Sequence, residues 1–288
     1  MEPERDEEAE GGGTRFALVV ACVAITIVNT VVPFGDVILY PFTLFGTWVH
    51  EMGHGLTALA LGGQLDRLEI FWNASGLAHC RGYGDGWPRA LVSMGGLLAP
   101  PLLGASILAF ARGPRRATMV LWGLSAVMLL SVALWVRSAA GFVAVPGVAF
   151  LIGLLAKEGS PTLKHVGAQG LGVLLALDTI FGVDYLFTST AFIDGEERAS
   201  DVANIASSVA GHWLLWGVVL AVISFALLAW RKTRLLAVAL GLALHVVLDT
   251  TTMVSTFGAS MALFLVTFLP WERRLFRTSS RSADPAST

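Results

Sequence analysis

The chain is short of charge, of cysteine and of any basic excess. Only 14% of its 288 residues are charged and 55% are hydrophobic, whereas a soluble domain has about 25% charged residues. So few charges cannot cover a water-exposed surface, which argues against a soluble globular fold, a disordered chain and a collagen. The two cysteines, Cys22 and Cys80, imply no disulfide framework. The net charge of -2 gives no basic excess, so no nucleic acid is expected as a partner.

Long hydrophobic runs take the place of the missing charges. A run of about 20 apolar residues crosses a bilayer as a helix, and residues 117–136 are apolar on all sides. We therefore expect an all-α polytopic membrane protein with about 8–9 transmembrane helices in a lipid bilayer. The alanine- and glycine-rich composition is compatible with a bacterial inner membrane. It gives no prediction of the oligomeric state.

The polar stretches divide the chain into three parts. Residues 1–14 are predicted to form a disordered acidic tail, residues 15–270 an integral membrane domain, and residues 271–288 a polar C-terminal tail. A kink or a break is expected at Pro100-Pro101 within one span. The expected spans are about 15–34, 41–61, 89–111, 116–136, 139–156, 165–187, 209–230 and 235–270. The last is long for one crossing and is expected to form two shorter helices.

One segment is too polar to span the bilayer. At about 64–82, two short and partly alternating runs flank Asn73-Ala74-Ser75-Gly76, which has the composition of a turn. The pattern predicts a small β-hairpin directly after the second hydrophobic helix. Gly62-Gly63 is a typical helix stop and predicts the end of that helix.

The second hydrophobic helix carries His50-Glu51-Met52-Gly53-His54. Histidines at positions i and i+4 project from one helix face, so both imidazoles can bind one Zn²⁺ ion. Glu51 lies beside them and can act as the general base that activates a zinc-bound water. A charge at the bilayer centre costs about 2.5–3.5 kcal/mol, so such residues usually have a function. The alternative is a set of polar helix residues hydrated near one membrane face.

This arrangement resembles the site-2 protease family of intramembrane zinc metallopeptidases. The likeness lies in His50-Glu51-Met52-Gly53-His54-Gly55, the hairpin turn, and the Gly-rich apolar segment that starts at Met94. The resemblance is to the compact bacterial type, with no inserted PDZ or CBS domain. It implies hydrolysis of peptide bonds in a transmembrane protein or peptide substrate, as in regulated intramembrane proteolysis.

A catalytic zinc takes three protein ligands, and the resemblance implies that the third is a distant aspartate. The Leu-Asp-Gly triplet that often supplies it in this family is absent here. Asp201, within Ala199-Ser200-Asp201-Val202-Ala203, resembles the Ser-Asp-Ala motif of compact members and is ranked first. Asp178 and Asp184 are the alternatives. Ser200-Asp201 is equally typical of an ordinary helix N-cap.

Two other functions fit the same residues. The first is a metal-ion transporter, since histidines and acidic residues in apolar helices also suit an ion in transit. The second is a catalytically silent membrane scaffold of the same fold. The intact set of His50, Glu51 and His54 favours the enzyme, because neither alternative needs a glutamate directly after the first histidine.

Overall fold

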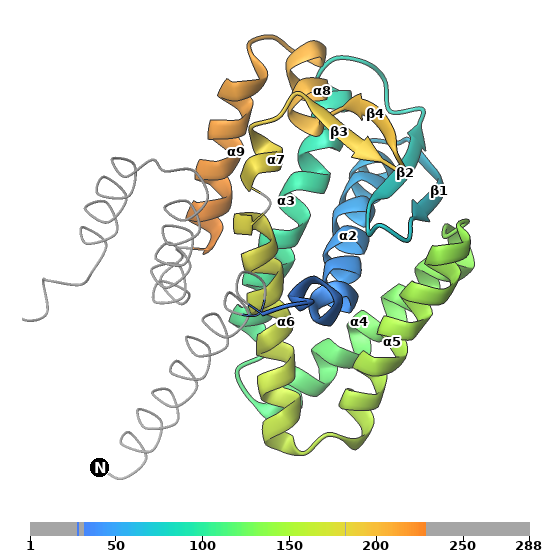
Figure 1. Ribbon diagram of the computed structural model, residues 1–288, viewed down its shortest axis with the longest axis vertical. Coiled ribbons are helices and arrows are strands. Elements are labelled where there is room, and N and C mark those ends of the chain that lie inside the picture. Colours follow the sequence, from blue (N-terminus) through green and yellow to red (C-terminus); the bar gives the residue numbers. More distant parts are fainter. Residues whose placement is uncertain (1–27, 29–31, 182, 229–288) are drawn as a thin grey trace, which may run out of the picture. The chain divides into compact units, whose positions relative to one another are not determined.

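The computed structural model describes residues 28, 32–181 and 183–228 (Figure 1). The two predicted tails, the span at about 235–270 and most of the span at about 15–34 lie outside these residues. The described part is mostly helical and contains two antiparallel hairpins. Its helices are α2 (Gly35–Ala60), α3 (Trp87–Phe110), α4 (Pro114–Leu134), α5 (Ala139–Glu158), α6 (Pro161–Phe181), α7 (Val183–Leu186), α8 (Asp201–Ser208) and α9 (Trp213–Leu228).

Three of these helices, α3, α4 and α5, are long and apolar enough to cross a membrane. The pair α8 and α9, bent by 115° at a short break, makes a fourth span if it is counted as one. A helical protein with a small β-hairpin is therefore confirmed. The count of about 8–9 spans is not confirmed, because the described residues contain three such helices, or four with the bent pair, and the other expected spans include residues outside the described part.

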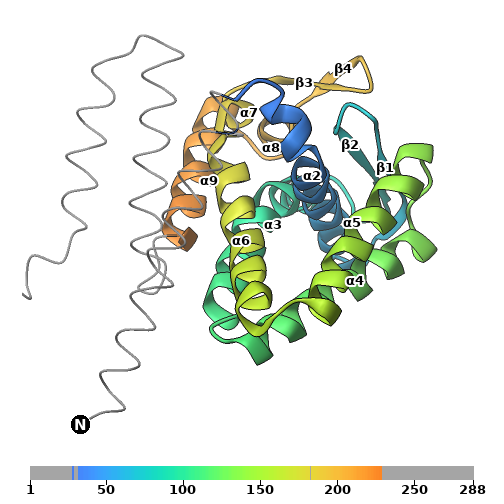
Figure 2. The same ribbon diagram turned by 60° about the horizontal axis from the view of Figure 1, so that its bottom comes forward.

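Helix α2 lies among α3, α5 and α6 and brings the metal-site sequence into the interior (Figure 2). Small residues allow α2 and α3 to pack closely, because a Cβ atom at Gly53 would collide with the carbonyl oxygen of Gly95. Helix α2 ends at Ala60, and Gly62 follows with φ of 82°, as expected for the helix stop.

Two helices differ from the expected pattern, one in where it begins and the other in having no break at its prolines. Helix α2 begins at Gly35 rather than at about residue 41, so Pro41 lies inside it. Helix α3 continues through Pro100 and Pro101, which are both buried. In membrane helices, neighbouring helices, Ser/Thr side chains and ordered water re-satisfy the carbonyls that a proline leaves without a hydrogen bond. The rule that proline ends a helix is therefore weaker here than in a soluble protein.

The predicted hairpin is present as β1 (Gln64–Ile70) and β2 (Gly76–Arg81). Strand β1 buries Leu68 and Ile70 against the helices. Its outer edge is closed by the α4–α5 connection, since the Leu68 N–H donates to the Trp135 carbonyl at 2.8 Å and the Arg137 N–H donates to the Leu68 carbonyl at 3.0 Å. Within the described residues, no strand pairs with the outer edge of β2.

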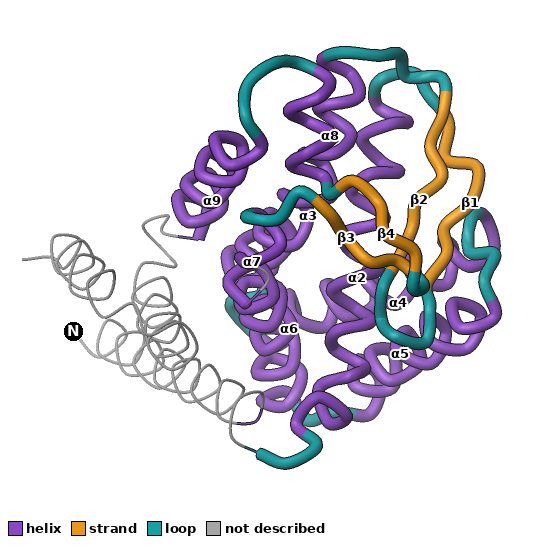
Figure 3. The backbone as a smooth tube through the Cα atoms, turned by 45° about the horizontal axis from the view of Figure 1, so that its top comes forward, coloured by secondary structure: helices purple, strands orange, loops and turns teal. Residues whose placement is uncertain are grey.

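A second hairpin was not predicted. Strands β3 (Thr190–Ile193) and β4 (Glu196–Ala199) lie between α7 and α8, and Asp194 and Gly195 form the turn with φ of 51° and 83°. The turns of the two hairpins meet, where the Asp194 N–H donates to Ser75 Oγ at 3.2 Å (Figure 3). An Asp-Gly pair is a strong hairpin signal, and this one was overlooked in the sequence.

Candidate metal centre

The two histidines of α2 point to the same place. Their Nε2 atoms are 3.0 Å apart, and the ring planes are nearly perpendicular. One helical turn separates the two residues, so helix α2 places both rings on the same face. Helix α3 leaves room for it, because a side chain at Gly96 would collide with the His54 ring.

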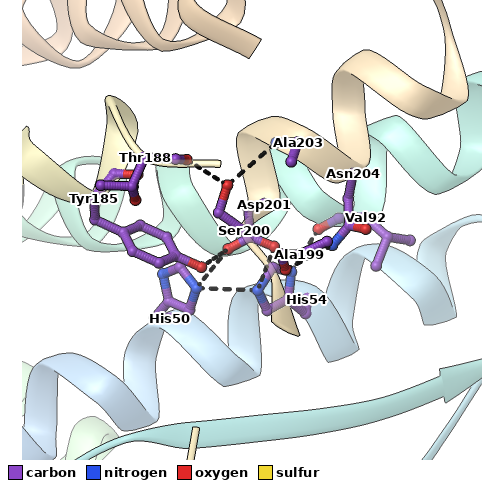
Figure 4. Close-up of polar contacts among 10 residues, drawn as sticks. All are labelled: His50, His54, Val92, Tyr185, Thr188, Ala199, Ser200, Asp201, Ala203 and Asn204. Carbon is purple, nitrogen blue, oxygen red and sulfur yellow. Dashed lines mark hydrogen bonds and ion pairs between the residues drawn. The ribbon is translucent and has the colours of Figure 1, made fainter. Parts of the chain in front are cut away.

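Asp201 reaches both histidines from α8. Its Oδ2 atom is 3.1 Å from His50 Nε2, and its Oδ1 atom is 3.5 Å from His54 Nε2 (Figure 4). Ser200 caps the helix, since its Oγ accepts the Ala203 N–H at 3.3 Å and donates to the Thr188 carbonyl at 2.6 Å. The cap fixes the first turn of α8 and with it the backbone of Asp201.

Hydrogen-bond partners outside the candidate ligand set orient the side chains of His54 and Asp201. His54 Nδ1 lies 2.8 Å from the Val92 carbonyl oxygen. A carbonyl only accepts, so Nδ1 carries a proton, and in the neutral ring the Nε2 lone pair is then available for a ligand bond. The Tyr185 hydroxyl donates to Asp201 Oδ2 at 3.1 Å, and its ring meets the His50 ring edge-on.

Glu51 lies beside this set and is only 6% exposed. One ligand atom from each of His50, Glu51 and His54 lies within 4.8 Å of the others. Strand β2 packs directly on this carboxylate, because a Cβ atom at Gly76 would lie 3.0 Å from Glu51 Oε1. The glutamate therefore stands between the histidines and the open strand of the first hairpin.

The donors line a cleft of ≈ 890 Å³. Its walls come from α2, β2, α3 and the second hairpin, with further residues from α6 to α9. Cys80 and Tyr83 lie at the end of the first hairpin and face the same cleft. Burial raises the pKa of the Cys80 thiol to about 11, and the charges of Glu51 and Asp66 add to this rise. The thiol is therefore protonated at neutral pH.

The other two candidate aspartates also line the cleft but do not reach the histidines. Asp178 on α6 packs against Gly46, one turn before His50, where a Cβ atom would lie 2.9 Å from its Oδ2. Asp184 on α7 is exposed. The described residues show neither an ion pair nor a hydrogen bond from either carboxylate to His50 or His54.

The chemistry and spacing of the donors fit a metal ion. Ligands that bind tetrahedral zinc at about 2.0–2.1 Å lie about 3.3 Å from one another. The two Nε2 atoms are 3.0 Å apart, and each lies near one oxygen of the Asp201 carboxylate, His50 at 3.1 Å from Oδ2 and His54 at 3.5 Å from Oδ1. Two imidazoles and one carboxylate also form a common donor set of catalytic sites that keep a position open.

A bundle of apolar helices around a partly buried His-Glu-His cluster defines a helical membrane protein with a candidate metal site. The chain belongs to the Peptidase M50B-like family, whose model matches residues 17–231. The resemblance to site-2 proteases is thereby confirmed, and membership of a metallopeptidase family with it. No curated protein and no solved structure matches the chain.

Proposed function

We propose that the protein is an intramembrane zinc metalloprotease. It hydrolyses peptide bonds of membrane-embedded or membrane-proximal protein substrates. One observation carries this proposal: Asp201 lies close to both histidines of a helix that also carries Glu51. Asp201 is 151 residues from His50 and 147 residues from His54 along the chain. Family membership supports the peptidase chemistry.

His50, His54 and Asp201 hold the zinc ion in this proposal. Bound there, zinc supplies Lewis acidity that polarises a carbonyl group and lowers the pKa of water to about 7. The Val92 carbonyl keeps the proton of His54 on Nδ1. His54 Nε2 therefore faces the site without a proton.

Glu51 is the general acid–base group. Its carboxylate takes a proton from the attacking water and delivers it to the nitrogen of the leaving amine. Burial beside strand β2 holds the carboxylate at the wall of the cleft on which a peptide would lie.

The free edge of β2 offers a place for the substrate. Carbonyl groups in a membrane helix are hydrogen-bonded within the helix, so a transmembrane substrate has to unwind before cleavage. An extended peptide gains new backbone hydrogen bonds by adding to a strand edge. The α4–α5 connection occupies the edge of β1, and Gly76 of β2 packs on Glu51. A peptide on β2 would therefore lie beside the proposed base.

The test compares two variants with matched controls in purified protein. Glu51→Gln should keep zinc bound and reduce cleavage of single-span membrane peptides by about 10²–10⁴-fold. The control Glu158→Gln changes an exposed glutamate of α5 and should leave cleavage unchanged. Mass spectrometry of the peptides gives the cleavage rate, and elemental analysis gives the zinc content.

The third ligand is tested by zinc content alone. Asp201→Ala should lower the zinc content several-fold, whereas the control Asp184→Ala should not. Unchanged zinc in Asp201→Ala would transfer the role to Asp178.

Full proteolysis by Glu51→Gln would remove Glu51 from catalysis. Zinc binding by the wild type without any chelator-sensitive cleavage would favour the silent scaffold, and zinc flux into liposomes would favour the transporter.

A further inference from the structure

Asp201 makes a third contact besides those to the histidines. Its Oδ2 atom accepts a hydrogen bond from the Tyr185 hydroxyl at 3.1 Å, the same distance that separates this atom from His50 Nε2 (Figure 4). The Tyr185 ring also stands edge-on to His50, with the ring centroids 6.2 Å apart. One tyrosine therefore contacts two of the three proposed ligands.

Tyr185 and Asp201 stand at the two ends of the segment that carries the second hairpin. We use the term flap for residues 190–199, that is β3, β4 and their turn. The ends of the flap are also joined by Ser200, whose Oγ donates to the Thr188 carbonyl and whose N–H donates to the Ser189 carbonyl at 3.1 Å. The hydrogen bond from Tyr185 to Asp201 also joins the two ends of the flap, on the side that lines the cleft.

The flap itself is weakly held. Both strands have largely exposed side chains, and β4 is exposed at every position. Its tip is fixed to the first hairpin by the hydrogen bond from Asp194 to Ser75. A peptide entering the cleft meets the flap, since Thr190, Phe192 and Arg198 are among the residues that line it. Only Ser200 separates Asp201 from the flap, so a displacement of the flap by a bound peptide would be passed on to Asp201.

A carboxylate needs a second contact to stay oriented under such motion. Ser200 fixes the backbone of Asp201, but rotation about the side-chain bonds still changes the direction of the carboxylate. A hydrogen bond to one oxygen removes this freedom, as outer partners of metal ligands commonly do. The Val92 carbonyl does the same for His54.

We infer that Tyr185 is a positioning residue whose hydroxyl keeps the Asp201 carboxylate turned toward His50 and His54. The inference rests on the proposed function. It assigns to Tyr185 an effect on metal affinity that acts through Asp201, in addition to any packing of its ring.

The test measures zinc affinity by competition with a chromophoric chelator. Tyr185→Phe keeps the ring against His50 and removes the hydroxyl, and should weaken zinc binding by roughly 10–100-fold. Tyr83→Phe is the matched control. It removes a hydroxyl in the same cleft, for which the described residues show no hydrogen bond. This control should bind zinc as the wild type does.

A double-mutant cycle separates positioning from packing. In an Asp201→Ala background, the further change Tyr185→Phe should have no effect on zinc affinity, because the group that Tyr185 orients is gone. The d–d absorption spectrum of the cobalt-substituted proteins gives a second readout, which should change in Tyr185→Phe and not in Tyr83→Phe.

Three results would overturn the inference in distinguishable ways. Wild-type affinity in Tyr185→Phe would remove the positioning role even if cleavage falls, since the hydroxyl would then act on the substrate. A full effect of Tyr185→Phe in the Asp201→Ala background would show a role that does not pass through Asp201. Absence of zinc binding by the wild type would overturn the proposed function together with the inference.

Discussion

The two hairpins differ in how they are attached to the helices. Strand β1 buries Leu65, Leu68 and Ile70 and is hydrogen-bonded to the α4–α5 connection along its outer edge. The flap buries none of its residues. It is held at its base through Ser200 and Tyr185, and at its tip through Asp194.

The difference separates a hairpin that is packed into the core from one that is held mainly at its two ends. Glu51 is packed on the first of these hairpins. Asp201 follows the weakly held hairpin, so the third proposed ligand needs its own restraints. Regions with few buried contacts open at a lower free energy than the core of a protein. The contrast therefore predicts different responses to mutation on the two sides of the cleft.

The largest difference should appear in stability. Leu68 is 0% exposed and Phe192 of the flap is 68% exposed. Leu68→Ala should lower the free energy of unfolding by about 2–5 kcal/mol, because it leaves a cavity among buried side chains. Phe192→Ala should change it by less than about 0.5 kcal/mol. Denaturant unfolding of the purified variants in micelles measures both values. Similar losses in both variants would contradict the view that only the first hairpin is built into the core.

Thiol reactivity should also separate the two hairpins. The pKa of Cys80 on β2 is raised to about 11, chiefly by burial. The thiol is thus protonated below that pH. A cysteine placed on the flap by Glu197→Cys would be exposed and have an ordinary pKa of about 8.5. At pH 7.5, iodoacetamide should modify Cys80 roughly two orders of magnitude more slowly than the flap cysteine.

The measurement needs one thiol at a time. Cys22→Ser isolates Cys80, and Cys22→Ser with Cys80→Ser isolates the flap cysteine. The rate at Cys80 should rise about tenfold for each pH unit from 7 to 10, since the thiolate fraction rises in that proportion. Equal rates at pH 7.5, or a rate at Cys80 that levels off near pH 9, would show that Cys80 is as accessible and as acidic as a surface thiol.

Sequence patterns predicted the features that depend on neighbouring residues. Gly62-Gly63 ended a helix, Asn73-Ala74-Ser75-Gly76 formed a turn, and the spacing of His50 and His54 placed both rings on one face. The flap was missed although Asp194-Gly195 favours a two-residue hairpin turn. Its strands have four residues each, and β4 is too polar to show the alternation that identifies a half-buried strand.

The identity of the third proposed ligand depends on contacts between distant parts of the chain. Sequence patterns rank the three candidate aspartates but do not select one. Asp201, Asp178 and Asp184 all lie far from His50 in sequence, and no spacing rule distinguishes among them. Only the fold shows that Asp201 approaches the histidines while Asp178 packs against Gly46. Tyr185 belongs to no sequence motif, because its relevance depends on where α7 places it relative to Asp201.

The smallest predicted effect concerns the contact between the two turns. Ser75→Ala removes the oxygen that accepts the Asp194 N–H. A typical hydrogen bond contributes about 0.5–1.5 kcal/mol, so hydrogen exchange at the Asp194 amide should become roughly two- to tenfold faster while global stability hardly changes. Ser207→Ala, which removes a serine bonded within its own helix to the Asn204 carbonyl, is the control. If exchange at Asp194 is the same in both variants, the tip of the flap is not held by the first hairpin, and the flap is attached only at its base through Ser200 and Tyr185.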